Sequence, residues 1–139
     1  MAIDYELLKA KAIAARERSY CPYSNFAVGA ALLTKDGKIY EGCNIENSSF
    51  TPTICAERTA IFKAVSEGYG KGDFAAIAIV GDTKGKEADN FCAPCGVCRQ
   101  VMLEFCEADF EVILVINKDK YEVHPMAEVM PLAFTSDSM

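Results

Sequence analysis

The sequence predicts an α/β protein, a three-layer α/β/α sandwich with a mixed five-stranded sheet. Residues 74–80 and 112–116 form two short, almost entirely apolar runs, which are typical of strands buried on both faces. Stretches in which apolar residues recur with a helical period alternate with the predicted strands. The Asp-Gly pair at 36–37 predicts a hairpin turn, so part of the sheet is antiparallel and the whole sheet is mixed.

The first predicted element is a helix from Asp4 to about Arg18. Asp4 belongs to a residue type that caps helix N-termini. Apolar residues with helical spacing form a stripe that would pack on the sheet: Ile3, Leu7, Leu8, Ala10, Ala14 and Ala15. We expect Lys9 and Arg16 to face water on the opposite side of this helix.

A loop and a hairpin come next. Residues 19–26 are rich in aromatic residues and contain Pro22, which indicates a loop. Its rings either cover the edge of the sheet or take part in function. The strands of the hairpin are predicted at 27–34 and 39–44, and a polar loop at 45–54 then leads to the next helix.

The second half of the chain alternates helices and strands. Gly68 ends the first of these helices, since glycine commonly follows a helix C-terminus. In chain order the predicted segments are a helix at 55–67, a strand at 74–80, a polar loop at 81–93, a helix from Pro94 or Cys95 to 106, strands at 112–116 and 121–123, and a helical turn at 126–130. This alternation places helices on both faces of the sheet.

Length and composition favour a single domain, 1–139, with a substantial core. The chain has 139 residues, of which 51% are hydrophobic. A net charge of −6 and a pI of about 4.8 argue against a nucleic-acid partner and favour a small-molecule substrate. The N-terminus lacks a signal-peptide pattern, and no apolar run approaches the ~20 residues of a membrane helix, so we expect a cytoplasmic protein without a membrane partner.

The cysteines carry the strongest functional signal. Seven is an odd number, which favours metal ligands and buried thiols over a disulfide framework. Cys55 begins one predicted helix, and Cys95 and Cys98 lie at the start of another, where the positive helix end favours thiolates. Three thiolates leave a tetrahedral Zn²⁺ with one open position for an activated water, which is the catalytic arrangement.

Two neighbours of Cys55 are candidates for supporting roles. Glu57 stands two residues further on and is free to move protons instead of holding metal. A glutamate in the first turn of a helix is also common for electrostatic reasons alone. Arg58 either donates hydrogen bonds to a thiolate sulfur, offsetting the negative charge of the site, or is a surface or salt-bridging arginine.

The remaining candidate ligands are weaker. Cys92 extends the pair to a CxxCxxC run and is an alternative ligand, but it lies before Pro94 and off the predicted helix start. His124, the only histidine, is expected in a late strand without a ligand role. The other thiols are expected to be small buried side chains: Cys21, Cys43 and Cys106.

These motifs resemble those of the zinc nucleoside and nucleobase deaminases, whose signature is H-x-E or C-x-E followed by P-C-x-x-C. The resemblance covers nearly the whole chain and narrows to the small homotetrameric cytidine deaminases, which implies a cytidine deaminase-like fold. The segments that carry it are PYSNF at 22–26, VGAA at 28–31, GCNIEN at 42–47, CAERTA at 55–60, PCGVCRQ at 94–100 and MPLAF at 130–134.

The resemblance implies an activity. The reaction would be zinc-dependent hydrolytic deamination of cytidine and 2′-deoxycytidine to uridine and 2′-deoxyuridine, with release of ammonia, as in pyrimidine salvage. One Zn²⁺ per subunit would be held by Cys55, Cys95 and Cys98, with Glu57 as acid and base. The family assembly implies a homotetramer with its sites at subunit interfaces.

The resemblance also implies substrate-binding residues. Asn44 and Glu46 match the pair that hydrogen-bonds the ribose hydroxyls, and a carboxylate there would repel a phosphate, so nucleosides would be preferred over nucleotides. Phe26 matches the ring that stacks on the base. The backbone N–H of Ala56 matches a donor to the pyrimidine carbonyl. Phe134 matches an aromatic residue that reaches into the site of a neighbouring subunit.

Three other interpretations remain open from the sequence. The first is a related zinc deaminase with another cytosine-bearing substrate, such as an antibiotic or an RNA strand. The second is a non-catalytic structural zinc-binding module, in which Cys92 or another side chain is the fourth ligand. The third is a redox protein in which Cys95 and Cys98 form a disulfide. Two features depart from the family pattern: Phe50 stands where many members have tyrosine, and the segment 82–91 is longer and more charged than expected.

Overall fold

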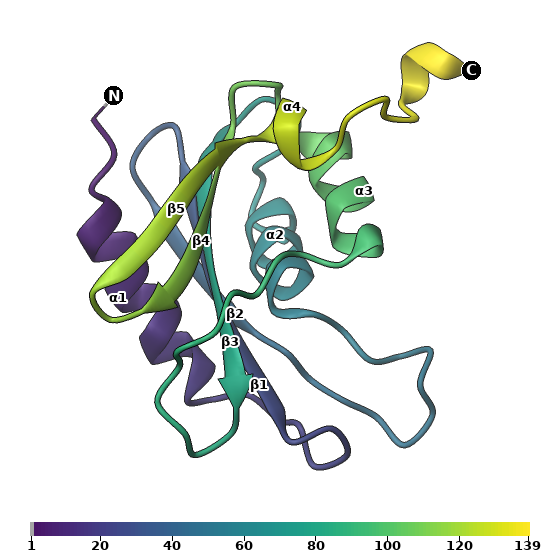
Figure 1. Cartoon of the computed structure of the whole chain (residues 1–139). Coiled ribbons are helices and arrows are strands. Elements are labelled where there is room, and N and C mark those ends of the chain that lie inside the picture. Colours follow the sequence, from purple (N-terminus) through teal and green to yellow (C-terminus); the bar gives the residue numbers. More distant parts are fainter. Residues whose placement is uncertain (1) are drawn as a thin grey trace.

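The computed structural model describes residues 2–139, and its elements follow the predicted order (Figure 1). None of the described helices is long and apolar enough to cross a membrane. The elements are α1 (Tyr5–Arg16), β1 (Phe26–Thr34), β2 (Ile39–Cys43), α2 (Ala56–Ser66), β3 (Phe74–Thr83), α3 (Gly96–Phe105), β4 (Glu111–Asn117), β5 (Lys120–Pro125), α4 (Met126–Val129) and a short 3₁₀ helix at Ser136–Ser138.

The five strands form one mixed sheet in the order β2-β1-β3-β4-β5. β1 pairs antiparallel with both β2 and β3, and β4 pairs antiparallel with β5. β3 and β4 are parallel, and α3 provides the crossover between them. The predicted mixed five-stranded sheet is therefore confirmed.

Helices cover both faces of this sheet, which gives the three predicted layers (Figure 1). Successive strand residues point to opposite faces. Ala30 and Leu32 of β1 accordingly belong to the core beneath α2 and α3, whereas Ala31 and Leu33 belong to the core beneath α1. Both faces of the central strands are thus buried, which explains their nearly continuous apolar sequences.

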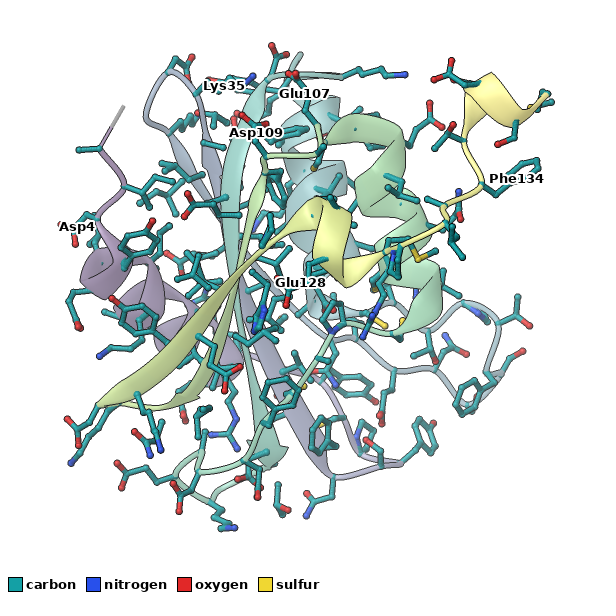
Figure 2. All side chains as sticks on the ribbon, turned by 45° about the horizontal axis from the view of Figure 1, so that its top comes forward. Asp4, Lys35, Glu107, Asp109, Glu128 and Phe134 are labelled. Carbon is teal, nitrogen blue, oxygen red and sulfur yellow. The ribbon has the colours of Figure 1, made fainter. Side chains whose placement is uncertain are left out.

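The predicted boundaries hold to within a few residues. Asp4 caps α1, accepting a hydrogen bond from the Leu7 N–H at 3.0 Å, and Figure 2 shows it at the start of that helix. β3 is longer than predicted and continues to Thr83, which lies opposite Phe26. The extension arises because β1 begins at Phe26 and supplies a pairing partner for polar residues that the sequence pattern assigns to a loop.

The prediction that Lys9 and Arg16 face water was wrong. Both are buried, with exposed fractions of 6% and 5%. The ammonium of Lys9 pairs with Glu6 at 2.6 Å. The guanidinium of Arg16 donates to three backbone carbonyls, those of Ala27 (3.0 Å), Thr83 (2.6 Å) and Lys86 (2.8 Å). Arg16 therefore ties α1 to the start of β1 and to the segment that follows β3.

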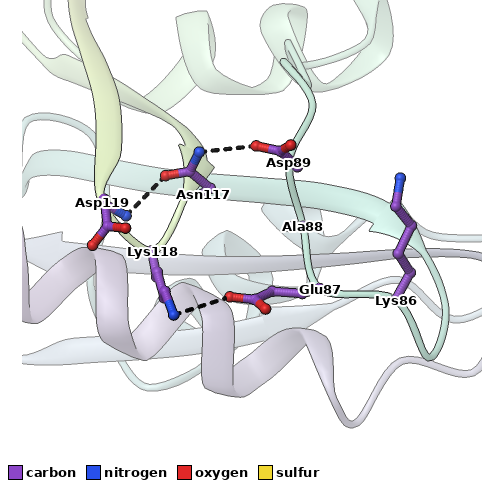
Figure 3. A pocket seen from close by; sticks show the side chains of 7 residues that line it. All are labelled: Lys86, Glu87, Ala88, Asp89, Asn117, Lys118 and Asp119. Atoms are coloured by element: carbon purple, nitrogen blue, oxygen red, sulfur yellow. Dashed lines mark hydrogen bonds and ion pairs between the residues drawn. The ribbon is translucent and has the colours of Figure 1, made fainter.

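The charged segment after β3 is fastened to the turn between β4 and β5. Asn117 donates to Asp89 at 2.9 Å, and Lys118 pairs with Glu87 at 3.6 Å. Figure 3 shows both contacts at a hollow of about 430 Å³ lined by residues 86–89 and 117–119. The charges of this segment contact one another and its neighbours, so they serve to attach the loop that leads to α3.

Candidate functional site

The first turns of α2 and α3 bring three cysteines together. Cys55 is the N-cap of α2, Cys95 is the N-cap of α3, and Cys98 lies in the first turn of α3. Their sulfur atoms all lie within 4.8 Å of one another, and those of Cys55 and Cys95 are 3.7 Å apart. Two thiolates on a tetrahedral Zn²⁺ with metal–sulfur bonds of ~2.3 Å lie ~3.8 Å apart, so the spacing fits the ion.

The pKa values of these thiols also fit a site that binds a metal cation. A hydrogen bond from the Cys98 thiol lowers the pKa of Cys55, and Arg58, whose Nη2 donates to the Cys55 sulfur at 3.4 Å, lowers it further against the effect of burial. The same shared proton raises the pKa of Cys98. A bound metal ion would replace the protons that these crowded thiols share.

Glu57 lies in the first turn of α2 and is 4% exposed. Burial raises the pKa of its carboxyl to about 7, and the nearby Cys55 adds to this shift. Within the described residues, the group of ligand atoms close enough to share a metal consists of the three cysteine sulfurs and does not include this carboxylate. Glu57 therefore stands beside the thiol group as a carboxyl that can carry a proton near neutral pH.

Asn44 is placed by hydrogen bonds to the first strand. Its Oδ1 accepts from the Val28 N–H and its Nδ2 donates to the Phe26 carbonyl, both at 2.8 Å. Asn44 is 8% exposed and its side chain bonds to the backbone at the start of β1. A second lone pair remains on the Oδ1 atom.

Glu46 is bound to the loop that precedes β1. Its Oε1 accepts from the backbone N–H groups of Tyr23 (2.9 Å) and Ser24 (3.1 Å), and its Oε2 accepts from the Ser24 hydroxyl. The hydroxyl bond, the largest contribution, and these N–H groups lower the pKa of Glu46, so it is a carboxylate at neutral pH. A hollow of about 240 Å³ opens beside it, lined by Tyr23, Ser24, Glu46, Asn47, Ser48, Phe50 and Thr53.

Phe26 lies against the backbone of β3. An ideal Cβ built on Gly81 would be 3.1 Å from the Phe26 ring and 2.8 Å from the sulfur of Cys92. The absence of a side chain at Gly81 therefore makes room for both groups. Phe26 is 41% exposed, so part of the residue remains accessible to a ligand.

The backbone N–H of Ala56 is available as a donor by helix geometry. Ala56 is the first residue of α2, and the first N–H groups of a helix have no partner within it. The residue is fully buried beside Glu57. Its N–H thus belongs to the same helix end that presents Cys55.

Phe134 lies in the C-terminal segment that follows α4. Its carbonyl accepts from the Gln100 side chain at 2.9 Å, and its ring is 61% exposed. Figure 2 shows Phe134 pointing away from the body of the molecule. Phe50, which has no hydroxyl where many family members have tyrosine, is 87% exposed at the edge of the hollow beside Glu46.

The weaker candidate ligands lie outside the thiol group. Cys92 is not among the three clustered sulfurs, and burial, followed by the charges of Glu57 and Cys55, raises its pKa to about 11. His124 lies between Glu122 (2.9 Å) and Glu128 (2.8 Å) on β5 and α4. The prediction of buried thiols is confirmed for Cys21 and Cys106, whereas Cys43 is only half-buried.

Sequence reasoning missed Ser24 and Gly81. Ser24 shares a turn with Phe26, accepting a hydrogen bond from its N–H at 3.0 Å. A serine whose hydroxyl accepts from the backbone N–H two residues later forms a local turn pattern, and this pattern could have identified Ser24 from the sequence. The contact of Gly81 with Phe26 and Cys92 joins distant segments and leaves no local signal.

Comparisons with known proteins agree with this geometry. Residues 3–114 match the family described as the cytidine and deoxycytidylate deaminase zinc-binding region. A cytidine deaminase of Sporosarcina psychrophila is 49% identical over 137 residues, which are 99% of this chain and 96% of the relative. A cytidine deaminase of Halalkalibacterium halodurans is 50% identical over 137 residues, covering 99% and 98%. The crystal structure of cytidine deaminase from Burkholderia pseudomallei, 48% identical, matches with a TM-score of 0.86 and covers 95% of this chain and 100% of that one.

The family is a zinc-binding one, and the thiols of Cys55, Cys95 and Cys98 form a group whose chemistry and spacing fit that ion. The match covers most of the chain, and the relatives align with it over nearly their full lengths. The chain belongs to the cytidine and deoxycytidylate deaminase family of zinc-binding proteins.

Proposed function

We propose that this chain hydrolyses cytidine and 2′-deoxycytidine to uridine and 2′-deoxyuridine, releasing ammonia. The observation that carries the proposal is the set of three clustered thiols with a buried carboxyl, Glu57, beside them. Three protein ligands are the number found in catalytic zinc sites, whereas structural sites use four. Two relatives that are named cytidine deaminase, 49% and 50% identical to this chain, support the same activity.

Cys55, Cys95 and Cys98 would hold Zn²⁺, which would supply an open position where water is activated as a nucleophile. The carboxylate of Glu57 would accept the proton that this water loses. It then delivers a proton to N3 of the cytosine ring as C4 gains its new C–O bond. Glu57 would next accept the proton of the new hydroxyl at C4 and pass it to the amino group, which leaves as ammonia while the C4 oxygen becomes the carbonyl of the product.

Arg58 balances the charge of the site. Three thiolates on one Zn²⁺ carry a net charge of −1, which weakens the metal as an acid. The guanidinium donates to the Cys55 sulfur at 3.4 Å and withdraws part of that charge. This geometry favours a role toward the thiolates over that of a surface arginine.

The base and the sugar have separate supports. The Phe26 ring would stack on the cytosine, and the N–H of Ala56 would donate to its 2-carbonyl oxygen. Glu46 would accept from a ribose hydroxyl, because an ionised carboxylate has about four acceptor positions and the loop uses three. Asn44 would act through its remaining lone pair. The negative charge of Glu46 disfavours a phosphate at this place, which supports nucleosides as substrates.

We further propose a homotetramer in which Phe134 completes the site of a neighbouring subunit. The Phe134 ring points away from its own chain (Figure 2), so it is placed for contact with another. Other large apolar side chains are exposed in the single chain: Phe50, Phe62, Val97 and Leu132. Such exposure favours burial against further subunits. Seven unpaired cysteines favour the cytoplasm, where thiols stay reduced.

The decisive experiment is loss of ultraviolet absorbance when the purified protein is mixed with cytidine, with and without a zinc chelator. We expect deamination that the chelator abolishes and added zinc restores, with about one zinc per chain by elemental analysis. Parallel assays of ammonia release should include 2′-deoxycytidine, cytidine monophosphate, a cytosine-bearing antibiotic and a short RNA. Turnover of one of the last two but not of cytidine would support the related-deaminase interpretation. A zinc-loaded protein inactive on all of them would support a structural module.

A further inference from the structure

The carboxylate of Glu46 is held by hydrogen bonds from Tyr23 and Ser24. Two consecutive backbone N–H groups, of Tyr23 and Ser24, donate to Oε1 at 2.9 and 3.1 Å. The Ser24 hydroxyl donates to Oε2. Hydrogen bonds to an ionised acceptor are stronger than those between neutral groups. The orientation of this carboxylate is therefore set by the loop on the opposite side of the hollow.

The same hydroxyl also contacts the residue that bears the aromatic ring. The Phe26 N–H donates to the Ser24 Oγ at 3.0 Å. A hydroxyl has one proton to give and can accept as well, so both bonds form at once, the proton going to Glu46 and a lone pair to Phe26. Asn25, between them, has a φ of 58°, a left-handed conformation that asparagine tolerates. The turn at Asn25 thus points the Phe26 N–H back at the serine.

No other side chain in the described chain is hydrogen-bonded to both Glu46 and the backbone of Phe26. Without the hydroxyl, the Phe26 N–H loses its partner and the carboxylate loses the bond to Oε2. The carboxylate could then rotate, and the start of β1 could shift relative to it. Ordering an exposed loop so that two groups keep a fixed relative position costs conformational entropy. The hydrogen bonds of the Ser24 hydroxyl offset part of that cost.

We propose that Ser24 is a positioning residue that fixes the sugar-binding carboxylate of Glu46 relative to the base-stacking ring of Phe26. Ser24 need not contact the reacting atoms. Its role is to let the base and the sugar hydroxyls be bound together by groups already in place. This inference rests on the proposed nucleoside substrate and adds a residue to which that proposal assigns no role.

The test compares Ser24→Ala, Ser24→Cys and Ser24→Thr with the wild-type enzyme on cytidine and on 2′,3′-dideoxycytidine. Only cytidine carries the sugar hydroxyls that Glu46 would bind. Losing a hydrogen bond to a charged group typically costs about 10- to 100-fold in affinity. We expect kcat/KM for cytidine to fall by about that factor in the alanine variant, mainly through KM, and much less for the dideoxy substrate. Cysteine, a weak donor, should behave like alanine, and threonine, which keeps the hydroxyl, should restore most of the loss.

A double-mutant cycle with Glu46→Ala adds a second criterion. If Ser24 acts through Glu46, the effect of Ser24→Ala on the ratio of the two kcat/KM values should largely vanish when Glu46 is already alanine. The ratio is measured within each variant, so it does not depend on the fraction of protein that is folded. Ser66→Ala, at the end of α2, is the matched control and should leave the ratio unchanged.

The outcomes separate this inference from the proposed function. Wild-type protein that does not deaminate cytidine refutes the proposed function itself. Active wild-type protein whose alanine variant loses the two substrates equally refutes the role of Ser24, as does an undiminished effect in the Glu46→Ala background. A selective loss on cytidine that threonine restores and Glu46→Ala abolishes supports it.

Discussion

The sulfur atoms of Cys55 and Cys95 lie 3.7 Å apart, although 40 residues separate the two positions in the chain. The contact exists because α2 and α3 lie on the same face of the sheet and begin at the same end of it (Figure 1). Each cysteine is an N-cap, so the dipoles of both helices act on one point. The metal site is thus a product of the crossover topology as much as of the cysteines.

Replacing one thiol should remove the metal. We predict that Cys95→Ser binds less than about one tenth of the wild-type zinc after dialysis, because two thiolates and a hydroxyl form a far weaker site. Deamination should fall in parallel. Elemental analysis of the purified variant and an absorbance assay on cytidine measure the two quantities.

Cys92→Ser is the matched control for zinc content. Cys92 is close in sequence but lies outside the group of three sulfurs, so this variant should keep about one zinc per chain. Full zinc content in Cys95→Ser, or loss of zinc in Cys92→Ser, would contradict the assignment of the ligands.

Replacing the carboxyl of Glu57 should separate metal binding from turnover. We predict that Glu57→Gln keeps its zinc and its melting temperature but loses about 10²- to 10⁴-fold in kcat, the range of general acid–base catalysis. The amide fills the same buried space but cannot carry a proton. Steady-state kinetics and elemental analysis check this, with the exposed Glu104→Gln on α3 as the control. Near-normal turnover in Glu57→Gln would remove this residue from the mechanism.

The sequence predicts most of the fold because each signal in it is local. The apolar runs of β3 and β4, the Asp-Gly turn and the cap at Asp4 each identify an element without knowledge of the others. The thiol site is predictable for a similar reason, since cysteines at two helix starts form a recognisable pattern. Chain topology then brings the patterns together.

What the sequence does not reveal depends on contacts between distant segments. Arg16 lies one helical turn from Ala12 and two from Leu8, so its spacing places it on the buried face of α1. An arginine is rarely buried, and its chemistry argues against that position unless carbonyl partners are known. The hydrogen bonds to Glu46 cannot be predicted for the same reason, because Ser24 and Glu46 belong to different loops.

Adding one methyl group at Gly81 should disturb the Phe26 ring. An alanine Cβ would lie 2.8 Å from the Cys92 sulfur and 3.1 Å from the ring, so one of them must move. We predict that Gly81→Ala raises KM for cytidine by about 3- to 10-fold and lowers stability by about 1–3 kcal/mol, as overpacking usually does. Enzyme kinetics and urea denaturation test this.

Gly70→Ala is the control for Gly81→Ala. Gly70 has open space around its ideal Cβ, and its φ lies outside the left-handed region, so both KM and stability should stay near wild type. Adding Cys92→Ala to Gly81→Ala makes room for the new methyl and should recover part of the loss. An unchanged KM in Gly81→Ala would show that the ring does not depend on this contact.

Arg16 should contribute to stability through its planar guanidinium, which donates to several carbonyls at once. A lysine at this position keeps the charge but cannot reach the carbonyls of Ala27, Thr83 and Lys86 together. We predict that Arg16→Lys lowers the free energy of unfolding by about 2–4 kcal/mol, since buried carbonyls are left without partners. Urea denaturation measures the change. Arg18→Lys, on a side chain that is 58% exposed, should change stability by less than about 0.5 kcal/mol. Equal effects of the two substitutions would contradict this role.

Asp82 should give the protein an acid-sensitive contribution to stability. Its carboxylate accepts hydrogen bonds from the N–H groups of Asp89 (3.0 Å) and Thr83 (2.7 Å) and from the Asn90 amide (3.1 Å). The two backbone N–H groups are the main cause that lowers the pKa of Asp82 from 3.8 to about 2. The folded state therefore favours the ionised form. The resulting stabilisation is complete above about pH 4 and is lost as the pH falls toward 2.

Asp82→Asn should remove this contribution, because an amide has only one acceptor oxygen for donors that need two. We predict a melting temperature several degrees below wild type at pH 7, and a gap that narrows steadily as the pH falls from about 4 to 2. Both proteins lose metal and protonate their other carboxylates over the same range, so the difference between them isolates Asp82. The exposed Asp109→Asn should melt like wild type at every pH (Figure 2). A gap for Asp82→Asn that stayed constant down to pH 2 would mean that the carboxylate stabilises the loop through packing and not through its charge.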